Sequence, residues 1–266
     1  MKVSDFQVLI WQQGRKLFRD MPWRTNTNPY YVLVSELMLQ QTQVERVIPK
    51  FHQFIETFPT VKALAQAPLA EVLKVWSGLG YNRRAKFLHE AAKKVVADFD
   101  GKIPGTLDEL VSLHGVGPNT AGAILAYSFN QPIVFIETNI RTVYFHHYFH
   151  DDGSVTDRQL REVVEQTLDR EHPREWYWAL MDYGALLKKQ GAGRLDKSKH
   201  YKKQTPLKGS LREVRGLILK ALAREDVPEA ELRRKMPQDD RFDRALRALK
   251  QEGLITQTEA TLHLTR

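Results

Sequence analysis

Along residues 1–187, apolar side chains recur every three or four positions, and strict alternation of apolar and polar residues is nearly absent. This spacing is typical of amphipathic α-helices, and a Gly or Pro ends most of the periodic segments. The predicted helices cover residues 28–41, 59–68, 69–80, 81–99, 106–115, 120–129, 138–149, 161–170 and 174–189. We therefore expect this part of the chain to be all-α.

Residues 208–266 follow a different pattern. Three helical segments, 210–225, 228–236 and 240–255, precede alternating residues over 254–266, as in a β-hairpin. Three helices and a hairpin are the element order of a winged helix, whose third helix would enter a DNA groove. Small helical tails of this kind also mediate protein contacts, so the pattern leaves both uses open.

The expected organisation is a helical domain at 1–187, a basic linker at 188–207 and a small α+β winged-helix-like domain at 208–266. The linker contains 7 basic residues and 1 acidic residue, which gives it +6 of the total net charge of +8. Such a stripe fits contact with a polyanion, although a solvated linker would have similar composition. Its candidate phosphate-binding residues are Lys188, Lys189, Lys199, Lys202 and Lys203.

Composition narrows the class of protein further. The hydrophobic content of 42% is enough for a folded core, and no apolar run approaches the roughly 18 residues of a membrane helix. The N-terminal residues lack the layout of a signal peptide, so we expect a soluble, cytoplasmic protein. The chain has no Cys, which excludes disulfides, thiolate zinc sites and iron–sulfur clusters.

The segment LHGVGPNTA predicts a tight glycine turn followed by a helix. Gly115 and Gly117 flank the apolar Val116, and Pro118 and Thr120 begin the next helix. Glycines permit positive φ and close backbone approach, and amides at a helix start can hold a phosphate. A plain helix–helix turn would look similar, but the flanking helices favour a helix-hairpin-helix phosphate clamp.

Two carboxylates stand out. Glu137 follows four apolar residues and precedes a helix that begins near Thr138 or Asn139, whose positive end favours the ionised form. Glu36 lies inside the apolar helix segment VLVSELML, where burial would raise its pKa and suit it to general acid catalysis. Such a pair fits cleavage of a glycosidic bond through a cationic sugar transition state. The alternatives are an ordinary first-turn Glu137 and a buried Glu36 that pairs with an Arg.

Five segments resemble the adenine-specific mismatch DNA glycosylases of the helix-hairpin-helix superfamily. They are MPWR, SELMLQQTQVERVIP, GLGYNRRAKFLH, LHGVGPNTAGAIL and MDYGALL, and they occur in unbroken order over about residues 8–187. SELMLQQTQV and GLGY are the segments that are similar to the adenine-specific branch. The resemblance implies an all-α helix-hairpin-helix glycosylase fold with two helical subdomains.

The resemblance also implies roles for individual residues. Glu36 matches the acid that protonates the leaving purine, and Glu137 stands where the family has an invariant aspartate supported by the residue matched by Asn139. Leu39 and Gln41 match residues inserted into the duplex, and Tyr81 matches a wedge that props open the base stack. Trp23, Arg24, Val44 and Asn119 are expected in the base pocket, and Arg84, Gly115, Val116, Gly117 and Thr120 are expected to bind DNA.

The sequence departs from the family in three places. Glu137 is one methylene longer than the aspartate, which would move the charge by about an ångström. The four cysteines that normally follow the GALL helix are absent, so we expect no iron–sulfur cluster and no metal site, although a monovalent cation at the hairpin is allowed. A winged helix replaces the family's Nudix-like C-terminal domain, which leaves recognition of oxidised guanine open.

The sequence therefore predicts a monofunctional DNA glycosylase of base excision repair that flips out a mispaired base, adenine first. Relatives that also cut the backbone have a Lys where this chain has Asn119, and an amide cannot form a Schiff base. The alternatives are a glycosylase for thymine, uracil or a modified base, and a DNA-structure-binding protein with weak catalysis. A regulator of transcription would leave Glu36 unexplained. We expect a monomer that binds double-stranded DNA and is associated with the nucleoid, and no membrane partner.

Overall fold

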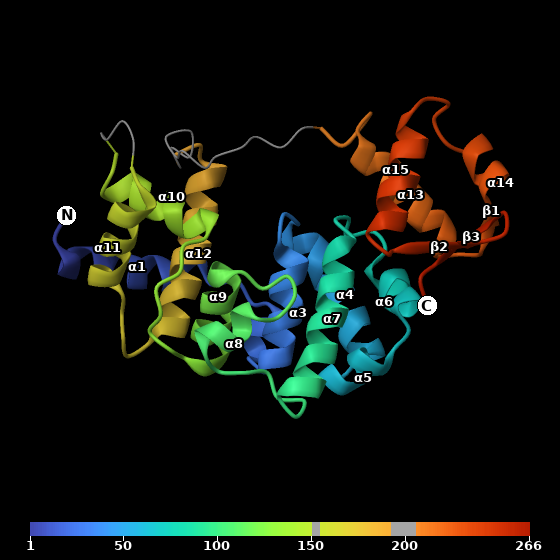
Figure 1. Ribbon diagram of the computed structural model, residues 1–266. Coiled ribbons are helices and arrows are strands. Elements are labelled where there is room, and N and C mark those ends of the chain that lie inside the picture. Colours follow the sequence, from blue (N-terminus) through green and yellow to red (C-terminus); the bar gives the residue numbers. More distant parts are fainter. Residues whose placement is uncertain (151–154, 193–205) are drawn as a thin grey trace. The chain divides into compact units, whose positions relative to one another are not determined.

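The computed structural model describes residues 1–150, 155–192 and 206–266 (Figure 1). Its contacts divide the chain into two compact units, and each unit combines segments that are distant in the sequence. The boundary crosses α3 between Val32 and Leu33 and crosses the hairpin between Gly115 and Val116. None of the described helices has the length and apolar character needed to cross a membrane.

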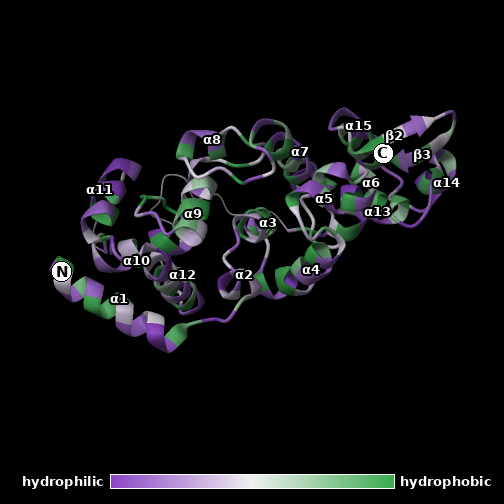
Figure 2. Ribbon diagram, turned by 90° about the horizontal axis from the view of Figure 1, so that it is seen from below, coloured by the Kyte–Doolittle hydropathy of each residue, from purple (hydrophilic) through white to green (hydrophobic). Residues whose placement is uncertain are grey.

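The first unit is helical. It contains α1 (Val3–Leu17), α2 (Pro22–Thr25), α8 (Leu107–Val111), α9 (Pro118–Phe129), α10 (Thr138–His147), α11 (Asp157–Thr167) and α12 (Pro173–Lys189). Helices α1 and α10 both pack on α12, where Trp176 and Tyr177 are completely buried. Figure 2 shows polar and apolar residues alternating around α1 and α11, as expected for helices that cover a core on one side.

The second unit begins with most of α3 (Pro29–Leu39) and continues through α4 (Val44–Thr57), α5 (Val61–Gln66), α6 (Leu69–Trp76) and α7 (Arg83–Asp98). Helices α5 and α6 pack on α7, and Phe54 and Trp76 are completely buried in this core. The apolar periodicity of the sequence does not delimit α4. This helix contains Pro49 and nevertheless continues to Thr57.

The C-terminal part of the second unit contains α13 (Leu211–Leu222), β1 (Val227–Pro228), α14 (Glu229–Arg234), α15 (Arg241–Gln251), β2 (Ile255–Thr258) and β3 (Thr261–Leu264). The strands form an antiparallel sheet in the order β1–β3–β2, with Ile255 opposite Leu264 and Val227 opposite Leu262. The predicted helices and hairpin are confirmed, and the two-residue β1 adds a third strand to the predicted pair.

Candidate active site and nucleic-acid interface

Glu137 is the residue immediately before α10, in the first unit. Its backbone is extended, with φ −97° and ψ 168°, and its side chain accepts no hydrogen bond from the first turn of α10. Burial raises the pKa of the Glu137 carboxyl group, so desolvation outweighs the helix dipole that was expected to favour the ionised form. The Glu137 side chain therefore does not cap its own helix through a hydrogen bond.

Two glycines allow close packing around the backbone near Glu137. A Cβ atom on Gly184 of α12 would lie 2.2 Å from the backbone oxygen of Asn139, so only glycine lets α12 approach the start of α10 this closely. A Cβ atom on Gly122 of α9 would lie 2.6 Å from Cβ of Phe135, two residues before the carboxylate. Neither glycine has a positive φ, and each is explained by close approach between elements.

Asn119, expected in a base pocket, has a second role in the structure. It is exposed in the first turn of α9, and its Oδ1 accepts a hydrogen bond from the backbone N–H of Ile136 at 3.2 Å. Because Ile136 directly precedes Glu137, this bond connects the hairpin helix to the backbone that carries the carboxylate. Contact of Asn119 with a base stays a prediction.

Glu36 lies on the part of α3 that belongs to the second unit. The residue is partly buried, and its neighbours Ser35 and Leu37 have no exposed surface. The mean hydropathy of α3 is high, as the segment VLVSELML predicted. The partly buried position of a carboxyl group on this helix fits the general-acid role expected of Glu36.

The residues predicted to enter the duplex have an unusual backbone conformation. Gln41 has a φ of 56° and Tyr81 a φ of 48°, a left-handed conformation that few residues with a Cβ adopt. Such a conformation costs about 1–3 kcal/mol, and observed cases cluster at functional sites. Leu39 ends α3 two residues before Gln41 and is partly exposed. Gln41 and Tyr81 are thus two of the five described non-glycine residues with a positive φ, and the resemblance assigns both of them to the opened duplex.

Arg84 differs from its expected role in DNA contact, because its guanidinium is buried and fully used within the protein. Nη1 donates to the backbone oxygens of Leu37, Met38 and Gln40, each at 2.7 Å. The same guanidinium donates to the backbone oxygens of Gly80 at 3.0 Å and Tyr81 at 3.3 Å. Arg84 therefore ties the Gln41 loop to the Tyr81 loop, and burial lowers its pKa to about 10.

The two glycines of the hairpin, Gly115 and Gly117, are explained by different physical features. Gly115 has a φ of 79°, and a Cβ there would lie 2.8 Å from Cβ of Phe87. Gly117 has a φ of −88° and no atom within 4 Å of a Cβ, so the fold itself does not require glycine at this position. Close approach of a ligand at the start of α9 would require it. The side chains of Val116 and Thr120 are buried, which leaves their backbone groups for any DNA contact.

The residues expected in the base pocket differ in their exposure and in their partners within the protein. Trp23 is buried and Val44 is partly exposed at the start of α4. The buried Arg24 donates to both carboxylate oxygens of Asp182, at 2.7 and 3.0 Å. This bidentate pair holds α2 against α12, so Arg24 has a structural role that the sequence did not indicate, and its contact with a base stays a prediction.

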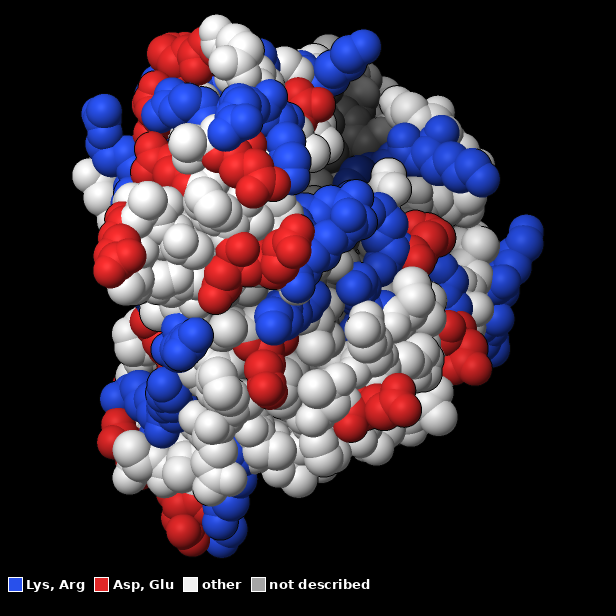
Figure 3. Space-filling model, turned by 90° about the vertical axis from the view of Figure 1, so that its right-hand side faces the viewer, with Lys and Arg blue, Asp and Glu red and all other residues white. Residues whose placement is uncertain are grey.

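The cations of the linker and of the C-terminal helices differ in their surroundings. Lys188 and Lys189 are exposed in the last turn of α12, whereas Lys199, Lys202 and Lys203 lie outside the described residues. On α15, the predicted reading helix, Arg241 pairs with Asp239 at 2.7 Å and Arg244 with Asp240 at 3.3 Å. Figure 3 accordingly shows basic and acidic side chains interleaved over the C-terminal part of the chain. This pairing reduces the positive charge that Arg241 and Arg244 would present to DNA phosphates, and the entry of α15 into a DNA groove stays a prediction.

The chain cannot supply the ligands of the iron–sulfur cluster that is common among proteins with this set of motifs. It contains no Cys, and α12 is followed by Lys-rich sequence where the cluster ligands would begin. Among the described residues, no group of three or more His, Asp or Glu side chains could hold a metal ion. The residues therefore do not fit the cluster.

Residues 34–168 match the HhH-GPD superfamily base excision DNA repair protein family. The adenine DNA glycosylase of Mycobacterium tuberculosis (strain ATCC 25618 / H37Rv) is 33% identical over 279 residues, which cover 96% of this chain and 91% of that protein. The adenine DNA glycosylase of Buchnera aphidicola subsp. Baizongia pistaciae is 37% identical over 183 residues, 68% of this chain and 51% of that protein. The chain thus spans about half the length of this second relative.

Among solved structures, a thermostable thymine-DNA glycosylase has a similar fold, with a TM-score of 0.65 and 24% identity. The match covers 75% of this chain and 96% of that structure. At this identity the likeness supports the architecture alone.

Proposed function

Because the chain belongs to the HhH-GPD superfamily of base excision DNA repair proteins, we propose that it is a monofunctional glycosylase that removes adenine from mispaired double-stranded DNA. Its similarity to adenine DNA glycosylases extends over nearly the whole chain. The observation that carries the proposal is Glu36, a partly buried carboxyl group on an apolar helix within the segment similar to the adenine-specific branch.

In the proposed reaction, the target nucleotide leaves the base stack while Gln41 and Tyr81 occupy the duplex. Protonated Glu36 gives its proton to a ring nitrogen of adenine as the bond from the sugar carbon to the base breaks. Water then attacks the sugar carbon and gives its proton to the Glu36 carboxylate, which leaves an abasic site and restores protonated Glu36. The base departs as neutral adenine, and the balance consumes one water molecule.

Glu137 stabilises the positive charge that develops on the sugar. Its carboxylate is costly in the free protein, because burial raises its pKa and no hydrogen bond from α10 compensates. A cationic sugar supplies the missing favourable interaction only as the bond to the base breaks. An interaction that strengthens toward the transition state lowers the barrier rather than only tightening binding.

The absence of an amine at Asn119 supports a monofunctional reaction. An asparagine amide cannot attack the sugar carbon to form a Schiff base, so water is the nucleophile. Borohydride should therefore trap no covalent complex between protein and DNA. A trapped adduct that disappears on substitution of one Lys would overturn this part of the proposal.

The remaining parts of the proposal concern partners and cofactors. We infer that the protein has no iron–sulfur cluster, since the chain has no Cys to bind one. We also propose that it acts as a monomer. The basic linker would hold phosphates, as would be useful to a protein associated with the nucleoid. Replacing Lys199, Lys202 and Lys203 by Gln should reduce the salt slope of DNA binding by about 2–3, near 0.9 for each lost phosphate contact.

The proposed specificity is tested with a panel of duplexes. Each duplex carries one mispair or one common lesion, and alkali after incubation converts abasic sites to strand breaks. The proposal predicts breaks at adenine in mispairs and none in fully paired duplexes. Breaks confined to mispaired thymine or uracil would assign another base, and no breaks on any duplex would favour a DNA-binding protein with weak catalysis.

A further inference from the structure

The loop between α6 and α7, residues 77–81, carries Tyr81 on an irregular backbone. Gly78 has a φ of 99° and Gly80 a φ of 78°, close to the left-handed Tyr81. Such residues interrupt the helical hydrogen-bond pattern at the end of α6. The carbonyl groups of this segment therefore need donors from elsewhere in the protein.

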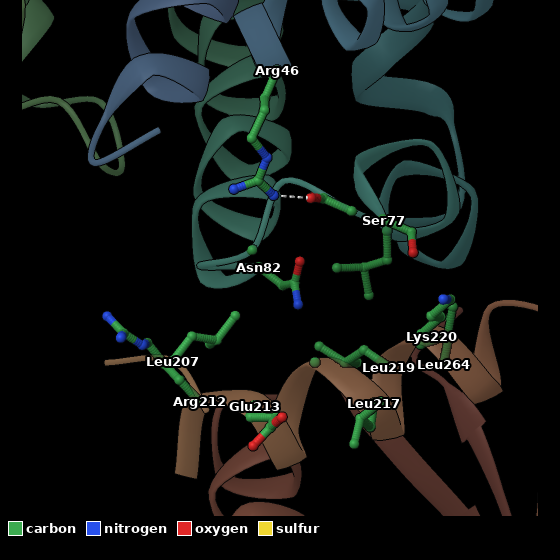
Figure 4. Close-up of a pocket in the computed structure, with 14 residues that line it drawn as sticks. Arg46, Ser77, Asn82, Leu207, Arg212, Glu213, Leu217, Leu219, Lys220 and Leu264 are labelled. Carbon is green, nitrogen blue, oxygen red and sulfur yellow. Dashed lines mark hydrogen bonds between the residues drawn. The ribbon is translucent and has the colours of Figure 1, made fainter. Parts of the chain in front are cut away.

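Two cations of α4 supply some of these donors. Arg46 Nη2 donates to the backbone oxygen of Gly78 at 2.5 Å, and Lys50 Nζ donates to the backbone oxygen of Val75 at 3.1 Å. Figure 4 shows the Arg46 side chain directed toward the loop, with this bond as a dashed line. Val75 lies in the last turn of α6, where carbonyl groups lack helical partners and a cation is favourable. Because Arg46 and Lys50 are one helical turn apart, α4 holds the loop and the end of α6 at two points.

The positions of these two cations carry an energetic cost. Arg46 lies in the first turn of α4, where the helix dipole disfavours a positive charge. Burial lowers the pKa of Arg84, and the nearby charge of Arg46 lowers it further, so the two guanidinium groups repel each other. Burial also lowers the pKa of the Lys50 ammonium group. The charge-assisted bonds to the backbone of Gly78 and Val75 help to offset these costs.

A pocket of about 490 Å³ separates this loop from α13 (Figure 4). Its lining includes Ser77, Gly78 and Gly80 of the loop and Leu217 and Leu219 of α13. A Cβ atom on Gly80 would meet no atom within 4 Å, so the backbone of the loop is not packed at this point. Arg212 of α13 contacts the Tyr81 side chain, but the loop backbone accepts its bonds from α4, α6 and α7. The conformation of the loop therefore depends on side-chain donors more than on packing.

Helix α4 also follows the other loop that is predicted to enter the duplex. It begins at Val44, three residues after Gln41. Arg84 joins the same two loops from α7, through bonds to the backbone oxygens of Gln40 and Gly80. The cations of α4 thus add a second connection between the two loops.

We propose that Arg46 and Lys50 are positioning residues that fix the Tyr81 loop to the helix that follows Gln41, so that Tyr81 and Gln41 enter the duplex together. The inference rests on the proposed function, since it takes Gln41 and Tyr81 as the residues that occupy the opened duplex. Neither cation needs to touch DNA in this role. Their effect on base release is exerted through Tyr81.

The test compares the wild-type protein with Arg46→Met, with the double variant Arg46→Met/Lys50→Met and with the control Lys74→Met. Methionine keeps much of the aliphatic length and removes the donors. Lys74 is an exposed cation in the last turn of α6. In single-turnover base release, the double variant should be about 10-fold slower or more, while its dissociation constant for DNA changes by less than about 3-fold. Arg46→Met, a change at an exposed position that leaves the core intact, should be intermediate, and Lys74→Met should match the wild type.

The same substitutions are then made in a Tyr81→Ala protein. If Arg46 and Lys50 act through Tyr81, they should slow base release no further in that background. Equal slowing with and without Tyr81 would overturn the inference. A smaller salt slope of DNA binding in the double variant, with equal slowing in both backgrounds, would identify phosphate contacts instead.

A fluorescence measurement separates this inference from the proposed activity. The probe is a mispaired duplex with 2-aminopurine, an analogue of adenine that brightens when it leaves the base stack, beside the mispair. The wild type should brighten it, and the double variant and Tyr81→Ala should brighten it less. Equal brightening by all three proteins, or none by the wild type, would overturn the inference. A wild-type protein that unstacks the probe but releases no base would contradict only the proposed function.

Discussion

The side-chain oxygen of Asn119 accepts a hydrogen bond from the backbone N–H of Ile136 at 3.2 Å. Ile136 is followed by Glu137, so a residue of the hairpin that is predicted to bind DNA helps to position the carboxylate that is proposed to stabilise the sugar cation. The predicted phosphate clamp and the Glu137 carboxyl group are thereby connected through one side chain. A shift of about an ångström at a catalytic group can cost up to about 100-fold in rate, which gives this bond a functional consequence.

Asn119→Ala should slow single-turnover base release by about 10-fold, because the segment before Glu137 loses one of its fixed points. The dissociation constant for DNA should change little, since the backbone amides of α9 remain. Gln131→Ala is the matched control, as it removes a side-chain bond to the backbone of Gly105 in the same unit. Equal rates for Asn119→Ala and wild type would show that the bond does not position Glu137.

Glu137→Gln should stabilise the free protein at neutral pH. The folded-state pKa of this carboxyl group is raised by burial above its ordinary value of 4.5, so the native state binds more protons than the unfolded chain. The stability of the wild type therefore falls as pH rises through that window, and the variant avoids the penalty. Melting temperatures should differ most near pH 7 and converge near pH 4.

The exposed Glu175, in the first turn of α12, provides a control with the same change of charge. Glu175→Gln should show no comparable gain at pH 7. A Glu137→Gln protein that is less stable than the wild type at pH 7 would mean that the ionised carboxylate is well compensated in the folded state. The ionised Glu137 would then not need a cationic sugar to offset the cost of its burial.

Arg84→Lys should destabilise the protein by about 2–3 kcal/mol, because an ammonium has three donors and cannot satisfy the carbonyl groups now held by the guanidinium. Urea denaturation measures this loss. Base release should also slow, since the Gln41 and Tyr81 loops lose their common anchor. Lys94→Ala, which removes a partly exposed ion-pair partner of Asp98 on the same helix, should have little effect on either quantity. If Arg84→Lys left the stability unchanged and reduced the salt slope of DNA binding, Arg84 would instead contact a phosphate directly.

Gly184→Ala should separate α12 from the start of α10. The added Cβ would lie 2.2 Å from the backbone oxygen of Asn139, so the helices must move apart at a cost of about 1–3 kcal/mol. Gly216→Ala on α13 is the stability control, since its Cβ meets no atom within 4 Å and alanine favours the helix. A Gly184→Ala protein with wild-type melting temperature and rate would refute the close contact.

The helices and the C-terminal hairpin were predictable because their apolar spacing is local. Strand β1 was not, since Val227 and Pro228 pair with β3 residues more than thirty positions away and form only two register pairs. Glu36 and Glu137 could be selected from the sequence alone. Glu36 is an acid among apolar residues, and Glu137 is an acid directly before a predicted helix. The sequence motifs also identified Gln41 and Tyr81, whose strained backbone then appeared in the structure.

The roles of the arginines and of Gly184 depended on tertiary contacts that sequence patterns do not contain. Arg83 and Arg84 are adjacent cations in the sequence, yet Arg83 is exposed and Arg84 is buried against carbonyl groups from residues more than forty positions away. Likewise, Arg24 meets Asp182 only because α2 packs near α12. The segment MDYGALL gives no reason for a glycine at Gly184. The reason is the close approach of the Asn139 backbone, which only the structure shows.

The central claim is that Glu36 and Glu137 perform two different steps in releasing one base. Single-turnover release of adenine from a mispaired duplex, measured for Glu36→Gln and Glu137→Gln beside DNA affinity, tests it most directly. The account predicts a loss on the order of 10²-fold or more in rate for each variant, with nearly unchanged affinity for DNA. Full activity of either variant would contradict the claim.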